Sequence, residues 1–239
     1  MTFVVFAGQS NALGFGMTAE TVPAAYASAD PLTYIWNNYI GGFEMLQPGV
    51  NTGTVANPGA WGPEVAFAHE FRLAHPSEPL FIVKSVKGST GLAQDPDELD
   101  WSPASHDEMF DLTAARVNAA RADLNSAPVD AVFFVQGEQD GFAEAKAEAY
   151  ACNLEALFGA IRSDWMGDDA GQILFARVGA PGFEAVAQAQ AEVDEADPHA
   201  ASFAAADLAM QDDALHYAAE GYLAIGTEFS ALFDPWSVL

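Results

Sequence analysis

The sequence predicts an α/β fold, a three-layer α/β/α sandwich around a parallel sheet. Short apolar runs alternate with stretches of helical periodicity along the chain, which is typical of strand–helix–strand units. Three of the apolar runs are continuous and rich in Val, Ile and Phe, as strands buried on both faces of a parallel sheet require. The chain has 239 residues, of which 51% are hydrophobic, so we expect a single domain over residues 1–239.

Five short apolar runs are predicted to be the strands. The first lies at the amino end, and the third, fourth and fifth are the continuous runs. The five runs are Thr2–Ala7, Leu32–Trp36, Leu80–Val86, Val129–Val135 and Ile173–Val178. In open α/β sheets, ligands bind at the edge where the carboxyl ends of the strands meet.

Helices are predicted where apolar residues recur every three or four positions, because that spacing places them on one face. Leu154, Leu157 and Ile161 form such a stripe within a segment rich in Ala, Glu and Leu. The predicted helices are Pro63–Ala74, Met109–Leu124, Ala143–Trp165, Phe183–Ala196 and Ala218–Phe233.

Two long segments fit neither pattern. Gly41–Gly62 is rich in Gly, Pro and Asn, and Gln94–His106 is rich in Asp, Pro and Ser. Long loops in compact domains are usually functional or disordered. Both segments follow predicted strand ends, so we expect them to form walls of a substrate site; the alternative is a plain surface excursion.

The chain is strongly acidic, with 34 Asp and Glu against 8 Lys and Arg and a formal net charge of −26. Phosphate recognition needs a basic footprint, so neither nucleic acid nor an anionic membrane is expected as a partner. A solvated acidic surface explains the composition, and halophilic proteins use such surfaces. We therefore expect salt to stabilise the fold by screening self-repulsion.

A single cysteine, Cys152, excludes an intrachain disulfide, and its place in a predicted helix favours a buried, inert thiol. The first residues lack the basic segment and the apolar length of a signal peptide. No apolar run is long enough to span a bilayer. We expect a soluble protein, either cytoplasmic or part of a larger or processed protein; the sequence does not define its oligomeric state.

A serine follows the first predicted strand directly, in Gly8-Gln9-Ser10-Asn11. A serine hydroxyl needs an adjacent base to act as a nucleophile, and histidine is the best-suited base. His216 stands in Asp213-Ala214-Leu215-His216, where Asp213 can orient the same ring. These residues predict a nucleophile, a base and an orienting acid, with neighbouring Asp212 as a rival for the last role.

An acyl-transfer site also needs donors for the oxyanion. The backbone N–H of Ser10 lies at a turn, and Gly88 follows the third strand, where the lack of a side chain lets the backbone approach a substrate. Gln136 follows the fourth strand, and its amide can point into the same crevice. We predict these three groups as the oxyanion hole.

These motifs resemble the SGNH hydrolases, and within them the sialate O-acetylesterase and acetylxylan esterase branch, carbohydrate esterase family 6. The matching blocks are Gly8–Asn11, a glycine best matched by Gly88 (Gly91 lies close by), Gln136–Asp140 and Asp213–His216. The resemblance implies the SGNH hydrolase fold with its flavodoxin-like sheet. It also implies deacetylation of O-acetylated sugars, with Ser10 as nucleophile, Gln136 in the oxyanion role, and neither metal nor cofactor.

Four further residues of these blocks are expected to support the site. Gln9 and Asn11 flank the serine, and Glu138 and Asp140 follow Gln136. Since Asp213 already fills the orienting position, we expect the two acids to hold the loop or assist His216 rather than act directly. Paired carboxylates can also indicate a glycosidase, but this spacing does not require them to face each other across a sugar.

The remaining histidines are scattered at spacings that disfavour a metal site. Only His106 lies in a long loop that is expected near the site. Trp61 and Trp101 lie in the two long loops, where they either stack on a sugar or pack the loop.

The resulting prediction is a serine esterase that removes O-acetyl groups from carbohydrates through an acetyl-serine intermediate. The alternatives are an esterase or lipase of another acyl specificity, and a carbohydrate-binding domain with a degenerate hydrolase fold.

Overall fold

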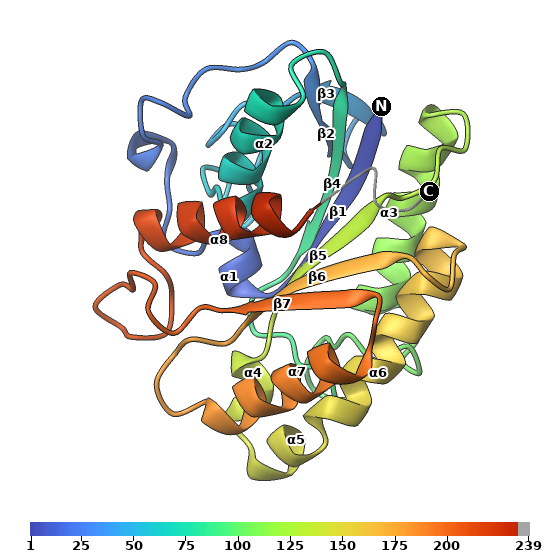
Figure 1. The fold of residues 1–239 in the computed structure, drawn as a ribbon, viewed down its shortest axis with the longest axis vertical. Helices are drawn as coiled ribbons and strands as arrows, with labels where there is room; N and C mark the ends of the chain where they lie inside the picture. The colour runs from blue at the N-terminus through green and yellow to red at the C-terminus, as the bar shows by residue number, and fades with distance from the viewer. Residues whose placement is uncertain (234–239) are drawn as a thin grey trace.

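The computed structural model describes residues 1–233 and contains a seven-stranded sheet in the order β3-β2-β4-β1-β5-β6-β7 (Figure 1). All neighbouring strands pair in parallel except β2 and β3, which are antiparallel. The strands are β1 (Thr2–Gly8), β2 (Thr33–Asn37), β3 (Gly42–Met45), β4 (Leu80–Val86), β5 (Ala131–Val135), β6 (Gln172–Arg177) and β7 (Ala200–Ala204). The predicted α/β fold class is confirmed.

Helices cover both faces of the sheet, with α2 and α8 packed together on one face and α3, α6 and α7 on the other (Figure 1). The α-helices are α1 (Ser10–Leu13), α2 (Pro63–Ala74), α3 (Met109–Asp123), α4 (Glu138–Gly141), α5 (Glu144–Glu148), α6 (Tyr150–Ala160), α7 (Glu184–Ala196) and α8 (Ala219–Leu232). Ala19–Thr21 forms a 3₁₀ turn and Ile161–Met166 a π-helical turn.

Each face of the sheet has its own apolar core. On one face, Phe6 and Phe133 of the sheet pack with Phe67 of α2 and Phe229 of α8 as an aromatic cluster. The opposite core is built around other large side chains, including Trp165. Burial of these side chains supplies the main driving force of the fold, and it fixes the strand ends that carry the polar loops.

Two strands were not predicted. Residues Ala200–Ala204 read AASFA, and this Ala-rich segment lacks the β-branched residues that mark strands. β3 lies inside Gly41–Gly62, where glycines masked a four-residue antiparallel edge strand. The sheet is therefore mixed at one edge rather than wholly parallel.

The predicted helix Ala143–Trp165 is divided into α5, α6 and the π-helical turn. No residue of α5 is fully buried and only Ala147 packs partly on the core, whereas α6 buries Tyr150, Leu154 and Leu157. Cys152 lies away from this stripe and is exposed, which corrects the prediction of a buried thiol. The one-domain expectation includes residues 234–239, which lie outside the described residues.

Three strand ends meet at one edge. Gly8, the last residue of β1, pairs with Val86 of β4 on one side and with Val135 of β5 on the other. The loops that begin with Gln9, Lys87 and Gln136 therefore start side by side. This is also where strand order reverses around β1, the position at which open α/β sheets bind ligands.

Candidate active site

Ser10 begins α1 immediately beyond the central strand. The turn depends on Gly8, whose φ is +136° and whose added Cβ would lie 2.1 Å from the carbonyl oxygen of Val135. Only glycine fits this conformation and this approach. The tight turn leaves Ser10 at the sheet edge, with 8% of its surface exposed.

His216 reaches Ser10 from a loop 206 residues further along the chain. Its Nε2 lies 3.1 Å from Ser10 Oγ, and its Nδ1 lies 2.7 Å from Asp213 Oδ2. Both distances are hydrogen-bonding distances. The predicted nucleophile, base and orienting acid are thus brought together in one row.

Asp213 is held in place by backbone hydrogen bonds within its own loop. Its Oδ1 accepts hydrogen bonds from the backbone N–H groups of Leu215 (3.0 Å) and His216 (2.9 Å). Burial opposes ionisation, but these N–H groups and the His216 ring together lower the pKa of Asp213 to about 2. Asp213 is therefore an anion across the neutral pH range, as an acid that orients an imidazole must be.

Two side chains, Phe15 and Asn11, fix the position of His216, and only Asn11 belongs to a sequence motif. The ring of Phe15 packs on the imidazole with a centroid separation of 4.5 Å. Asn11 Nδ2 donates to the carbonyl of Leu215 (3.1 Å), and its Oδ1 accepts from the backbone N–H of Tyr217 (3.2 Å). Asn11 therefore ties the serine turn to the histidine loop. Phe15 was missed, because its contact with His216 joins segments that are distant in the sequence.

Glu138 lies beneath this loop rather than in the row. Its Oε1 accepts a hydrogen bond from Asn11 Nδ2 (2.6 Å), while Oε2 is buried without a described partner. Burial raises the pKa of Glu138 despite that hydrogen bond and the nearby His216. Glu138 contacts Asn11, not the His216 ring, through the hydrogen bonds described.

Two backbone N–H groups beside Ser10 are free to act as donors. Neither the N–H of Ser10 nor that of Gly88 donates to any residue in the described part of the chain. A Cβ on Gly88 would lie 3.7 Å from Ser10 Cβ and near nothing else, so this glycine faces the serine. A Cβ on Gly91 would instead lie 3.2 Å from Asp140 Oδ1, which favours Gly88 over Gly91.

Gln136 departs from its predicted role. Its Nε2 donates to the carbonyl of Thr90 (3.0 Å) and to Asp140 Oδ2 (2.7 Å), and its Oε1 accepts from the Tyr150 hydroxyl (2.8 Å). Both amide hydrogens are used, so the side chain offers no donor to a substrate. The correction has a physical cause: Gln136 is 1% exposed, and a buried amide must satisfy its own hydrogen bonds.

Asp140 and Gln9 complete an internal network that joins the loops. Asp140 accepts from the backbone N–H groups of Leu92 (2.9 Å) and Ala93 (3.3 Å) as well as from Gln136. Gln9 Oε1 accepts from the N–H groups of Gly137 and Gln139, each at 3.3 Å. Burial raises the pKa of Asp140, although these hydrogen bonds oppose the effect. The network locks the loops after β1, β4 and β5 to one another.

A cavity of about 620 Å³ opens beside the serine. Its wall includes Phe15, which packs on the His216 ring, and Gly88, which faces Ser10, whereas neither His216 nor Ser10 is itself a lining residue. Residues 53–57 of the Gly41–Gly62 segment form another part of the wall, as predicted. The Gln94–His106 segment contributes no residue to this cavity. Lys87 and Arg116 also line it; the sequence reasoning missed them, although cations are scarce enough in this chain to have been a signal.

The two tryptophans of the long loops are not sugar platforms. Trp61 and Trp101 are fully buried, and their indole N–H groups donate to Thr18 and Thr90 respectively. Both therefore pack their loops, and the stacking alternative is wrong. His106 has 92% of its side chain exposed and does not line the cavity.

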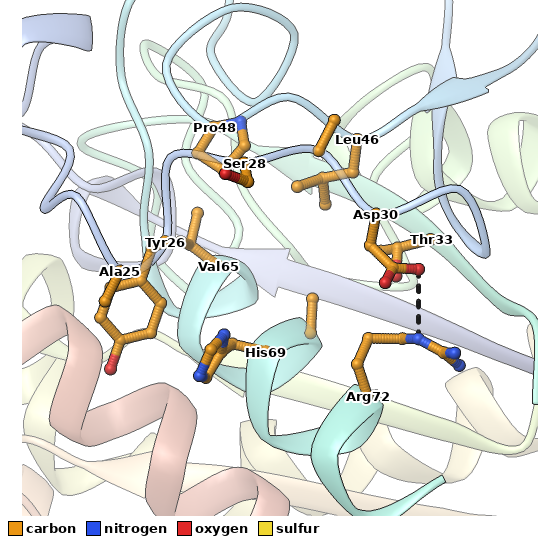
Figure 2. Close-up of a pocket in the computed structure, with 12 residues that line it drawn as sticks. Ala25, Tyr26, Ser28, Asp30, Thr33, Leu46, Pro48, Val65, His69 and Arg72 are labelled. Atoms are coloured by element: carbon orange, nitrogen blue, oxygen red, sulfur yellow. Dashed lines mark ion pairs between the residues drawn. The ribbon is translucent and has the colours of Figure 1, made fainter. Parts of the chain in front are cut away.

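A second cavity of about 240 Å³ lies apart from this site, between α2 and the loop that precedes β2 (Figure 2). Figure 2 shows Tyr26 beside His69, and Arg72 paired with Asp30 at 3.2 Å. None of the residues that form the Ser10 row lines it. Its polar groups are directed to each other, and we assign it no role.

Within residues 1–233, no three His, Cys, Asp or Glu side chains are grouped so that they could bind a metal ion together. No helix of this part is both long and apolar enough to cross a membrane.

Comparisons with known proteins identify one matching family and several similar folds. A family model described as carbohydrate esterase, sialic acid-specific acetylesterase, matches residues 1–234. No curated protein sequence matches the chain. A solved structure from Arabidopsis thaliana is similar with a TM-score of 0.81 and 20% identity over 96% of each chain.

Two solved esterases share the fold at lower similarity. A carbohydrate acetylesterase from Xanthomonas citri has a TM-score of 0.66 and 16% identity, covering 96% of this chain and 55% of that one. A variant of the acetyl xylan esterase Axe2 from Geobacillus stearothermophilus has a TM-score of 0.53 and 14% identity, covering 95% and 92%. At these identities the likeness shows a common fold.

Proposed function

Because the chain belongs to the carbohydrate esterase family of sialic acid-specific acetylesterases, we propose that it removes O-acetyl groups from carbohydrates through an acetyl-serine intermediate. Family membership makes the chain a carboxylic ester hydrolase. The single observation that carries the finer proposal is the row in which His216 lies within hydrogen-bonding distance of both Ser10 (3.1 Å) and Asp213 (2.7 Å).

In the first half-reaction, Ser10 Oγ attacks the carbonyl carbon of the acetyl ester while His216 Nε2 takes the hydroxyl proton. Asp213 accepts a hydrogen bond from Nδ1 and stabilises the imidazolium that forms. The C–O bond to the sugar then breaks, and His216 returns the proton to the departing sugar oxygen. Acetyl-serine remains.

In the second half-reaction, water gives a proton to His216 and attacks the acetyl carbon. The bond between the acyl carbon and Ser10 Oγ then breaks as the proton returns to Oγ, and acetic acid leaves and ionises to acetate. The oxyanion formed in each half accepts hydrogen bonds from the backbone N–H groups of Ser10 and Gly88. Gln136 does not donate here. It holds the loop through its bonds to Thr90 and Asp140.

The remaining motif residues act through position. Asn11 connects the serine turn to the histidine loop, and Glu138 holds the Asn11 amide from below. Gln9 and Asp140 hold the neighbouring loops. Since buried hydrogen bonds between loops fix the geometry of those loops, we assign these four residues a supporting role.

The test is hydrolysis of p-nitrophenyl acetate by the wild type and by Ser10→Ala, beside a series of longer acyl esters. We expect turnover of the acetate ester that falls with acyl length and that drops at least about 10³-fold in the variant. Turnover that survives in a folded Ser10→Ala protein would overturn the proposal. A preference for long acyl chains would redirect it to a lipase-type specificity.

A further inference from the structure

A smaller cavity of about 280 Å³ adjoins the cavity beside Ser10, and part of the wall is common to both. The smaller cavity begins at the carboxyl end of β2, where Trp36 and Asn37 belong to its wall. β2 pairs with β4, and β4 leads to Gly88 in the larger cavity. The two cavities therefore follow one another along the same edge of the sheet. The residues that line both are Asn38, Tyr39, Gly53, Thr54, Val55 and Lys84.

Tyr39 is the aromatic residue of this shared wall, and it is 78% exposed. Each of the other five tyrosines packs on an aromatic ring or uses its hydroxyl in a hydrogen bond. Tyr39 does neither within residues 1–233. Single exposed apolar side chains are common on protein surfaces, but this one lies between two cavities. Its ring is therefore available to a ligand that extends from one cavity to the other.

The backbone that carries Tyr39 is held in place. Tyr39 lies in the turn between β2 and β3, and its N–H donates to Asn37 Oδ1 (2.8 Å). The same oxygen accepts from the N–H of Ile40 (3.4 Å), and the carbonyl of Asn37 accepts from the N–H of Gly41 (3.0 Å). Asn37 Nδ2 donates in turn to Glu44 on β3. An asparagine that bonds its own turn in this way fixes the turn, so binding at the ring orders little backbone.

The smaller cavity carries no net charge. The chain has 34 acidic residues, yet none of the thirteen residues that line this cavity is acidic. Its one basic residue, Lys84, lies 2.8 Å from Glu64 Oε1, and 4% of the lysine side chain is exposed. That pair is an internal link between β4 and α2. The cavity therefore suits a neutral group rather than an ion.

The shared wall also has hydrogen-bonding groups left for a ligand. The Asn38 side chain is exposed and forms no hydrogen bond to described residues. Thr54 Oγ1 accepts from the N–H of Asn57 (3.3 Å), which leaves its own hydrogen free. In the smaller cavity, the indole N–H of Trp36 likewise donates to no residue of the described part of the chain. An exposed aromatic face beside uncharged donors and acceptors matches a sugar ring, which has an apolar face and a rim of hydroxyls.

We propose that Tyr39 is the stacking platform of a second sugar-binding subsite, which holds a neutral sugar unit linked to the acetylated one. This inference rests on the proposed esterase function. The acetylated unit occupies the larger cavity near Gly88, and the linked unit lies on the Tyr39 ring and reaches the smaller cavity. The preferred substrate is then an acetylated sugar that is still joined to another sugar. Tyr39 determines specificity and takes no part in the bond changes at Ser10.

The experiment compares two pairs of mono-O-acetylated substrates in which the second member has one additional neutral sugar. One pair is methyl xyloside and methyl xylobioside, the latter acetylated on either unit in separate preparations. The other pair is the methyl glycoside of sialic acid and the same acetylated sialic acid linked to methyl galactoside. Each preparation is a mixture over the free hydroxyls of the acetylated unit. Acetate release gives kcat and KM, and p-nitrophenyl acetate reports the esterase site alone.

The proteins are the wild type, Tyr39→Ala, Tyr39→Phe and Ile40→Ala. Tyr39→Phe keeps the ring and removes only the hydroxyl. Ile40→Ala is the matched control, because Ile40 is a 64% exposed residue of the same turn that lines neither cavity.

We expect the wild type to favour the longer member of at least one pair by about tenfold in kcat/KM. Tyr39→Ala should lose about fivefold to tenfold on that substrate, mainly through KM. Tyr39→Phe and Ile40→Ala should stay within about twofold of the wild type on it. Hydrolysis of the shorter members and of p-nitrophenyl acetate should stay within about twofold in all variants.

Equal kcat/KM for the shorter and longer members of both pairs in the wild type would overturn the inference. Equal losses on short and long substrates in Tyr39→Ala, or a loss as large in Ile40→Ala, would also overturn it. A loss in Tyr39→Phe as large as in Tyr39→Ala would show that the hydroxyl and not the ring face binds, and would contradict stacking. A wild type that is dimeric in solution, and that Tyr39→Ala converts to monomers, would assign the ring to an interface between copies.

Failure of the two proposals is distinguishable. Hydrolysis of p-nitrophenyl acetate with none of the sugars as substrate overturns the second subsite and leaves the serine esterase. Failure of a folded wild type to hydrolyse p-nitrophenyl acetate as well as every sugar contradicts the esterase proposal itself.

Discussion

The loops that follow β1 and β5 begin side by side, yet they use their polar groups in opposite ways. After β1, Ser10 keeps its backbone N–H free and holds its hydroxyl 3.1 Å from His216. After β5, the side chains of Gln136 and Asp140 form hydrogen bonds to each other and to neighbouring loops. The comparison separates groups with hydrogen-bonding capacity left for a substrate from groups that fix the site. Motif membership alone does not make that distinction.

The largest effect is expected for the groups proposed to act in the reaction, and it is tested by comparing Asp213→Ala with Asp212→Ala. In the proposed mechanism Asp213 orients His216, whose Nδ1 lies 2.7 Å from Asp213 Oδ2. The neighbouring Asp212 is exposed and forms no side-chain hydrogen bond to described residues. We expect about 10³-fold loss of kcat on p-nitrophenyl acetate for Asp213→Ala and less than about twofold for Asp212→Ala. Equal losses would show that the orienting role is wrongly assigned.

For the groups that hold the loops in place, we predict an effect on stability instead. Asp140→Ala leaves the N–H groups of Leu92 and Ala93 and the Gln136 amide without their acceptor in a buried place. We expect a loss of about 3 kcal/mol or more in the free energy of unfolding, measured by urea denaturation. Asp123→Ala, at an exposed position on α3, is the matched control.

An Asp140→Ala protein of unchanged stability would break the distinction between the two loops. If that stable variant also lost activity as completely as Ser10→Ala, Asp140 would instead be a group that acts on the substrate.

Glu138→Gln tests the buried acid between the two loops through its pH dependence. Burial raises the pKa of Glu138 above the ordinary value of 4.5, so the folded state binds the proton more tightly than the unfolded state. Its contribution therefore favours folding at low pH and declines as pH rises from about 4.5 through the folded-state pKa. Glutamine cannot ionise, and its Oε1 can still accept from Asn11.

We expect the melting temperatures of the wild type and Glu138→Gln to be close at pH 4. As pH rises to 8 the variant should become the more stable, with a melting temperature higher by about 2–4 °C for each kcal/mol of difference in the free energy of unfolding. kcat on p-nitrophenyl acetate should stay within about threefold, because Asn11 keeps its acceptor. A temperature difference independent of pH, or a variant that loses stability as pH rises, would contradict the effect of burial. A loss of activity like that of Asp213→Ala would show that Glu138 takes part in the reaction rather than only holding the loop.

The smallest expected effect concerns the surface outside both loops. With a net charge of −26, self-repulsion opposes folding and salt screens it. We expect the melting temperature to rise by a few degrees between about 0.05 and 1 M NaCl. A melting temperature indifferent to salt would remove the stabilising role of screening.

The sequence predicted the parts of this protein that strong local patterns determine. The continuous runs of β4, β5 and β6 and the placement of Ser10 and His216 follow from apolar periodicity and from motifs at strand ends. β7 could not be predicted, because its pairing with β6 rather than its own Ala-rich sequence makes it a strand.

The site was only partly predictable for a related reason. A polar residue after a strand shows that a loop reaches the sheet edge, but not which way its side chain turns. Gln136 turns inward because Tyr150, Thr90 and Asp140 satisfy it there, and those partners come from distant segments. Lys87 and Arg116 belong to no motif, and their shared cavity appears only when β4 and α3 are packed.

The most direct test of the central claim is covalent labelling with a fluorophosphonate, which reacts with activated serine hydroxyls, followed by peptide mass analysis. The account predicts one adduct, on Ser10, formed in parallel with loss of esterase activity and at least about 10²-fold more slowly in His216→Ala. An adduct on another serine that accounts for the lost activity, or labelling of Ser10 at an unchanged rate in His216→Ala, would contradict it.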